Sequence, residues 1–235
     1  MSETKRSFAT DLQDVSERYL DQVAWTVDQV TGTLELYRAD RTEFYESVEH
    51  IKGLESDCDA LLDEIRTTLG ESMRAELSDI QVESSALLEV YLGIDEIVNR
   101  TEQFLADMAA MEPDLSETAL ADLIRMADFL RMATDRLATA VSDLLGQLCR
   151  PDEANIAESV TAPVTEIGSL ESSCDSIRHK LIGDTFARSP TAEALLVREL
   201  AVTLDSALDA VEDAADQLLL LDSSAESDVE FDVTD

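Results

Sequence analysis

The sequence predicts an all-α protein, and three observations carry this prediction. The 235 residues include only 7 Gly and 4 Pro, so the chain has few places at which it can turn sharply. Apolar residues recur at steps of three and four along most of the chain, which is the spacing of one buried face of an α-helix. Hydrophobic residues make up 45% of the chain, enough to form a sizeable core. A few long helices account for all three features.

Breaks in the apolar pattern divide the chain into six helices of roughly 30 residues, each about 45 Å long. We expect these helices at 7–38, 41–69, 75–111, 116–149, 153–186 and 190–221. In the first helix, Trp25 lies among Val23, Val27 and Val30, and we expect it in the core. The second helix carries one apolar seam, formed by Ile51, Leu54, Cys58, Leu61, Ile65 and Leu69.

The boundaries of the later helices are predicted from capping residues and proline. After the third helix, Ser116 is placed to cap the fourth. Pro163 falls inside the predicted fifth helix, and we expect it to kink or interrupt that helix. Ser189 and Pro190 supply an N-cap and a first helical residue for the sixth helix.

Two short stretches of the chain read almost alike, LESDCD at 54–59 and LESSCD at 170–175. At their offset of 171 − 55 = 116, the nine-residue segments that contain them share six residues. A second related pair, GIDEIVNRTEQF and ALDAVEDAADQL, begins at Gly93 and Ala207, at an offset of 207 − 93 = 114. We interpret these matches as an internal duplication.

The duplication predicts a division of the chain into two three-helix bundles, 1–113 and 114–221. Each repeated hexapeptide then lies in the second helix of its half, and the second repeated element lies in the third helix. The remaining residues, 222–235, keep their acidic charge but lose the apolar period, and we expect a disordered acidic tail there.

The charge of the chain restricts its partners. There are 52 acidic and 17 basic residues, for a formal net charge of −35. Nucleic acid and anionic membrane surfaces are therefore disfavoured as direct ligands. Such acidity suits a salt-rich cytoplasm that screens self-repulsion, so we expect a halophilic source, and a halophilic archaeon is our interpretation. An apolar run of about 18 residues and a signal peptide are both lacking, which predicts a cytoplasmic protein without membrane insertion.

Carboxylates at helical spacing are the candidate functional residues. Residues four apart lie on one face of a helix, so each LESxCD element points a Glu and an Asp the same way, and the following helix can bring further oxygen ligands beside them. All-oxygen ligation suits Mg²⁺, Mn²⁺ or Fe³⁺. The candidate metal ligands are Glu55, Asp59, Asp95 and Asn99 in the first half and Glu171, Asp175, Asp209 and Asp213 in the second.

The alternative for each acidic pair is an ordinary solvated helix face, because acidic residues are so frequent in this chain. The neutral amide of Asn99 weakens the first set as a metal site. Cys58 and Cys174 are interpreted as packing residues. His179 could extend the second acidic stripe, but the matching residue in the first half is Asp63. The chain has no phosphate-binding glycine loop, no nucleophile elbow and no Glu-x-x-His.

At these motifs the chain resembles the PhoU-like family, and in particular the PhoU-related regulators encoded beside Pit-type phosphate permeases. LESDCD and LESSCD resemble the LExxAD element of that family, with Cys where Ala is common. LDAVEDAADQL, at 208–218, resembles its LERIGDHAENI element.

The resemblance implies two three-helix bundles that bind metal clusters through E/DxxxD motifs and regulate phosphate uptake without catalysis. The ligands it implies are Glu55, Asp59 and Asp95 in one half and Glu171, Asp175, Asp209 and Asp213 in the other, while Asn99 departs from the expected Asp.

We therefore expect a non-catalytic accessory protein of inorganic phosphate transport whose partner is a phosphate permease or a phosphate-signalling protein. A divalent or trivalent metal (Fe, Mn, Mg or Zn) is the expected cofactor, and a homo-oligomer is compatible with the sequence. One alternative is a helical hydrolase that uses carboxylate-bound metal to cleave phosphate esters, which requires a pocket with basic residues at the carboxylates. The other is a plain helical adaptor without metal.

Overall fold

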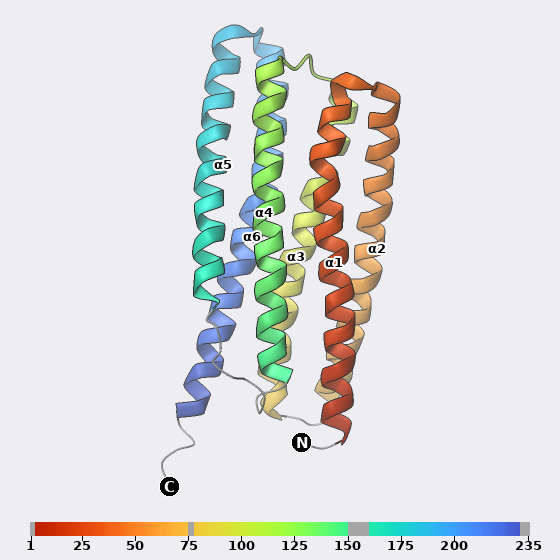
Figure 1. The fold of residues 1–235 in the computed structure, drawn as a ribbon, viewed down its shortest axis with the longest axis vertical. Coiled ribbons are helices and arrows are strands. Elements are labelled where there is room, and N and C mark those ends of the chain that lie inside the picture. The colour runs from red at the N-terminus through yellow and green to blue at the C-terminus, as the bar shows by residue number, and fades with distance from the viewer. Residues whose placement is uncertain (1–2, 75–77, 150–159, 231–235) are drawn as a thin grey trace.

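The predicted all-α fold is confirmed by a computed structural model that describes residues 3–74, 78–149 and 160–230. Over these residues the chain forms six long helices and no strand (Figure 1). The helices are α1 (Glu3–Ala39), α2 (Arg41–Arg74), α3 (Ser78–Met111), α4 (Glu117–Cys149), α5 (Thr161–Arg188) and α6 (Thr191–Glu230). None of these described helices has an apolar stretch long enough to cross a membrane.

The largest differences from the predicted helix boundaries are at the start of α5 and the end of α6, while α1 begins at Glu3 rather than at 7 and α2 ends at Arg74 rather than at 69. Helix α5 begins at Thr161 rather than at 153, and most of the intervening residues lie outside the described part of the chain. Pro163 therefore lies in the first turn of α5, where a missing N–H breaks no helical hydrogen bond, and the predicted kink is wrong. Helix α6 continues past 221 to Glu230, because residues 222–230 contain no Pro or Gly to end it. Residues 231–235 of the predicted tail lie outside the described residues.

Short connections with local caps join the helices. The Ser116 hydroxyl accepts a hydrogen bond from the Ala119 N–H at 3.1 Å, so the predicted cap of α4 is confirmed. Asp40, which the sequence analysis did not single out, caps α2 by accepting from the N–H groups of Thr42 and Glu43. The buried Tyr37 hydroxyl donates to the carbonyl of Pro113 at 2.7 Å and so fastens the α3–α4 connection to α1.

The packing of the helices has the symmetry that a duplication predicts. In each half the second helix packs against the first and third, so α2 and α5 lie on opposite flanks of the bundle (Figure 1). The halves join through α1 against α4 and, most extensively, α3 against α6. Each packed pair therefore maps onto a packed pair when the halves are exchanged.

One continuous core runs through both halves. Its largest fully buried side chains include Tyr19, Tyr37, Tyr91, Phe44 and Phe104, all from the first half. Alanines line much of the buried side of α6 instead, and they let α3 approach closely. The division of the chain into three-helix bundles at 1–113 and 114–221 stays a prediction, and the two halves share this core.

Two buried positions differ from the expected ones. Trp25 is 46% exposed and packs edge-on against the His50 ring of α2, with the ring centroids 5.7 Å apart, so its prediction as a core residue is wrong. In α2 the seam is buried as expected except at Leu61, which is only partly buried, and Leu62 beside it is fully buried.

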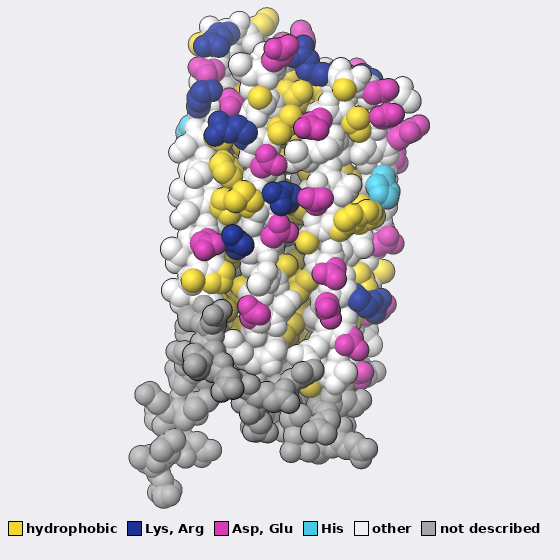
Figure 2. Space-filling model, in the orientation of Figure 1, with side chains coloured by type: hydrophobic (Ala, Val, Ile, Leu, Met, Phe, Trp, Pro, Cys, Tyr) yellow, Lys and Arg dark blue, Asp and Glu magenta, His cyan; other side chains and the backbone are white. Residues whose placement is uncertain are grey.

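The face formed by α1 and α4 carries acidic and basic side chains side by side (Figure 2). Arg131 of α4 forms ion pairs with Asp28 of α1 and Asp135 of its own helix. Arg136 of α4 pairs with Glu166 of α5. Arg131 and Arg136 on this side are thus each paired with a carboxylate.

Candidate functional site

The structure brings the first set of candidate ligands together on the neighbouring helices α2 and α3. Glu55 and Asp59 come from α2, and Asp95 and Asn99 come from α3. The Asn99 amide donates to Asp95 Oδ2 at 3.2 Å, and Glu102 of α3 is an electrostatic neighbour of Glu55. We call Glu55, Asp59, Asp95, Asn99 and Glu102 the first carboxylate face.

The first carboxylate face holds more negative charge than its surroundings balance. Burial, reinforced by the Asp59 carboxylate, raises the pKa of Asp95 to about 6, although the Arg66 guanidinium and the Asn99 amide oppose this shift. Burial also raises the pKa of Glu55, and Asp59 adds to the effect. A cation bound here would remove the repulsion between these carboxylates.

The second set of candidate ligands is gathered in the same way on α5 and α6. Glu171 and Asp175 lie on α5, and their charges act on Asp209 of α6, whose pKa is raised mainly by burial and then by Glu171. Glu212 and Asp213 complete the group. We call Glu171, Asp175, Asp209, Glu212 and Asp213 the second carboxylate face.

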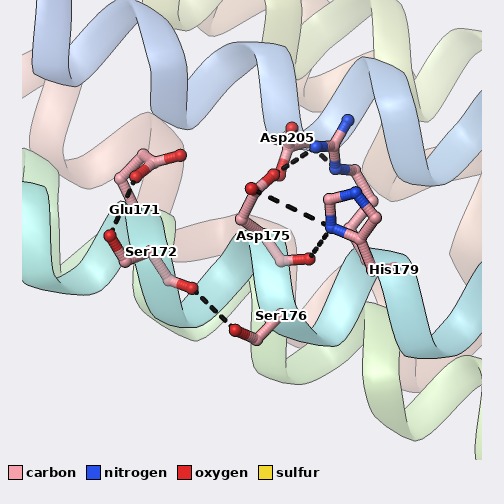
Figure 3. A network of polar contacts seen from close by, with 7 residues as sticks. Glu171, Ser172, Asp175, Ser176, His179 and Asp205 are labelled. Atoms are coloured by element: carbon pink, nitrogen blue, oxygen red, sulfur yellow. Dashed lines mark hydrogen bonds and ion pairs between the residues drawn. The ribbon is translucent and has the colours of Figure 1, made fainter.

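The second carboxylate face includes an ion pair that the sequence analysis missed. Arg178 of α5 pairs with Asp175, and its Nε lies 3.1 Å from Oδ2 of Asp205 on α6. The Asp205 side chain is only 7% exposed. Figure 3 shows Asp175 and Asp205 pointing toward one another from the two helices. Arg178 also acts on Asp209 from the facing helix and opposes the rise in its pKa.

Both cysteines on these helices are packing residues, as predicted. Cys58 and Cys174 are each 1% exposed. Burial raises the pKa of Cys58 to about 12 and the pKa of Cys174 further still, so neither thiol is poised as a thiolate. His179 is exposed, and its Nδ1 lies 2.8 Å from the backbone carbonyl of Asp175.

The two faces differ in how well their donors suit a metal ion. The first offers carboxylates and one amide, an all-oxygen set of the kind that hard cations prefer. The second offers carboxylates without an amide, together with the guanidinium of Arg178. Within the described parts of the chain, no group of three His, Cys, Asp or Glu side chains is arranged to hold a metal ion. Ligation would therefore require side-chain rearrangement at either face.

A pocket of about 120 Å³ lies elsewhere, between α4, α5 and α6 near the α5–α6 turn. Its lining mixes charges, including Asp122, Asp184, Arg188 and Glu193. No residue of either carboxylate face lines it. This pocket therefore does not provide the site at the carboxylates that the hydrolase alternative requires.

These features define a class of protein: a six-helix bundle of two related halves, with carboxylates facing one another on the second and third helices of each half. A scan against protein families and a search of curated protein sequences give no match. Two solved structures from Shewanella oneidensis MR-1 have the same fold.

One of these structures is a PhoU-like protein, with a TM-score of 0.78 and 15% identity over 91% of this chain and 99% of that chain. The other is proposed to be a PhoU-like phosphate regulatory protein, with a TM-score of 0.75 and 16% identity over 89% of this chain and 98% of that chain. The likeness spans nearly all of each chain and confirms the predicted PhoU-like fold.

Proposed function

We propose that this protein is a non-catalytic PhoU-like regulator of inorganic phosphate transport, of the kind that accompanies a Pit-type permease. The observation that carries the proposal is the whole-chain likeness to the structure proposed to be a PhoU-like phosphate regulatory protein. The motifs at Glu55 and Glu171 support it, because both lie on the matching second helices of the two halves.

The proposed mode of action is contact with a phosphate permease, or with a phosphate-signalling protein, in the cytoplasm of a halophilic archaeon. A net charge of −35 favours partners with basic surfaces. The cytoplasmic loops of membrane transporters carry an excess of Lys and Arg and have the complementary charge. Screening by a salt-rich cytoplasm would make the contact depend on close-range complementarity more than on long-range attraction.

Deleting the gene tests this function, and we expect phosphate uptake to lose its dependence on the external phosphate concentration. Uptake of labelled phosphate is measured in the deletion strain and in the same strain with the gene restored, at scarce and at plentiful phosphate. A tagged copy, crosslinked in cells, is expected to co-purify with a phosphate permease. Unchanged uptake together with no permease in the crosslinked fraction would contradict the proposal.

We further propose that the first carboxylate face binds a metal ion (Fe, Mn, Mg or Zn), held by Glu55, Asp59 and Asp95 with the Asn99 amide. The cation would fasten α2 to α3 and set the surface they present. The ionised form of Asp95 is disfavoured because the residue is half-buried and lies near Asp59. A bound cation would stabilise this ionised form. A second metal at Glu171, Asp175, Asp209 and Asp213, expected from the sequence, is not part of this proposal.

Replacing Glu55 by Gln together with Asp59 by Asn is expected to abolish metal binding at the first face. The protein is purified without chelator, its metal content is determined by mass spectrometry, and its melting temperature is recorded with added metal and with chelator. The unsubstituted protein should melt several degrees higher with metal, since ligands that bind only the folded state stabilise it.

The matched control for the first face replaces Glu49 by Gln and Asp57 by Asn, two exposed residues of the same helix, and removes the same charge. This control should keep the metal. A melting temperature unaffected by metal and chelator in the unsubstituted protein would favour the plain adaptor instead. Release of phosphate from a phosphate ester would favour the hydrolase.

A further inference from the structure

The two carboxylate faces differ at one pair of matched positions. At the offset of 116 between α2 and α5, Arg178 corresponds to 178 − 116 = 62, which is Leu62. At the offset of 114 between α3 and α6, Asp205 corresponds to 205 − 114 = 91, which is Tyr91. Leu62 and Tyr91 are both fully buried, without a formal charge. The second half has an ion pair at the positions where the first half has two uncharged core residues.

The ion pair lies at the inner edge of the second carboxylate face. Asp205 is 7% exposed and Arg178 is 23% exposed, so neither charge is fully hydrated. Charges in such places persist when they are paired. Arg178 is shared: it contacts Asp175 as well as Asp205, and its charge also acts on Asp209. One guanidinium thus balances carboxylates from both helices.

We infer that Arg178 is the built-in cation of the second carboxylate face, and that this face takes no metal ion while Arg178 is present. A metal bound by Asp175 and Asp209 would meet the guanidinium at close range and be repelled by it. Displacing Arg178 would leave Asp205 buried without its cation, which is costly. Only the comparison with a metal bound at the first carboxylate face rests on the proposed function.

The two halves differ in how easily a metal ion could displace the arginine beside the carboxylates. On the first face the cation whose charge acts on Asp95 is Arg66, which is exposed and already paired with Asp63. Because Arg66 and its partner Asp63 are both exposed, a metal that displaces Arg66 would leave no buried charge unpaired. Arg178 cannot be replaced so easily, because its partner Asp205 is inside the fold.

The test counts Mn²⁺ ions bound per chain by electron paramagnetic resonance of the free ion. Replacing Arg178 by Met removes the charge and keeps the length of the side chain. We expect the Arg178→Met protein to bind one more Mn²⁺ per chain than the unsubstituted protein, at roughly millimolar concentration or below, as weak carboxylate sites do. Adding Asp209→Asn and Asp213→Asn to this variant should remove the extra ion.

The matched control is Arg136→Met, because Arg136 pairs with Glu166 at the exposed α4–α5 surface and its loss changes the net charge equally. This control should gain no Mn²⁺. Where Arg178→Met fails to fold, judged by circular dichroism, the double variant Arg178→Met with Asp205→Leu restores two uncharged residues, as in the first half. It retains Glu171, Asp175, Asp209 and Asp213, and it is also expected to gain one Mn²⁺.

Two outcomes would overturn the inference: a folded variant without Arg178 that gains no Mn²⁺, or an unsubstituted protein that loses one Mn²⁺ when Asp209 and Asp213 alone become Asn. Failure of the first face is recognised separately. In that case the unsubstituted protein binds no Mn²⁺ at all, while the variant without Arg178 still binds one.

Discussion

Replacing Gly93 by Val is expected to lower the free energy of unfolding by about 2 to 3 kcal/mol, the cost of overfilling a packed interior. Gly93 lies on α3 where that helix meets α6. A Cβ atom at this position would lie 3.1 Å from the Cβ of Ala214 and 3.5 Å from its Cα. A valine adds two further carbons with few allowed rotamers, so α3 and α6 must separate to accommodate it. Urea unfolding followed by circular dichroism measures the loss.

The control for Gly93 is the same substitution at Gly32, which lies exposed within α1 and has no atom within 4 Å of an added Cβ. Valine has a higher helix propensity than glycine, so Gly32→Val should stabilise the protein by about a few tenths of a kcal/mol. If both variants prove equally stable, α3 and α6 do not approach as closely as the structure shows.

The Gly93 substitution also probes how the halves support the candidate site. Asp95 lies two residues after Gly93 on α3, and the α3–α6 contact is the most extensive between the halves. Displacing α3 would shift Asp95 relative to Asp59 of α2. We therefore expect the Gly93→Val protein, where it remains folded, to bind metal at the first face more weakly than Gly32→Val.

The helices and the grouping of carboxylates could be predicted from the sequence because both follow from periodicity. Helical spacing places Glu171 and Asp175 on one face, and the matched motif one helix later identifies Asp209 and Asp213. The structure brings these groups near one another, as the electrostatic effects on Asp209 show. These predictions depend only on helical spacing and on the order of the helices along the chain.

The Arg178–Asp205 pair could not be predicted because it depends on the rotation of two helices about their axes. Each residue alone looks like one more charge in a highly charged chain, and nothing local indicates that Asp205 is buried. The signal that could have found the pair is the comparison of matched positions, since Leu62 and Tyr91 are uncharged. Trp25 was misplaced for a related reason: the buried stripe of α1 runs through Val23, Val27 and Val30, and Trp25 lies nearly opposite Val23.

Replacing Asp205 by Asn is expected to make the protein less sensitive to pH between about 4 and 6. Burial is the main cause that raises the pKa of Asp205 from 3.8 to about 6, with Asp209 and Asp175 adding to the rise, while Arg178 and the Cys174 thiol oppose it. The folded protein therefore holds this proton more tightly than the unfolded chain does. Stability due to Asp205 is present below the unfolded pKa and is lost as the pH rises toward the folded value.

The size of this effect is at most about 3 kcal/mol, the linkage energy of a shift of about two pKa units. Asparagine has no proton to lose, so the stability of Asp205→Asn relative to the unsubstituted protein should rise by this amount from about pH 4 to 6 and stay level above it. Urea unfolding at a series of pH values and one fixed salt concentration measures the difference. Fixed salt matters because the other carboxylates also ionise in this range and repel one another.

The control for Asp205 is Asp143→Asn, at an exposed position of α4, which changes the net charge by the same amount. It separates the effect of burial from that of total charge: its stability should follow the unsubstituted protein at every pH, with a small constant offset. If Asp205→Asn also runs parallel to the unsubstituted protein, the Asp205 carboxylate ionises as readily in the folded chain as in the unfolded one. The attraction of Arg178 would then cancel the effect of burial on the pKa of Asp205 completely. The Arg178–Asp205 ion pair would in that case add no pH dependence to the free energy of unfolding.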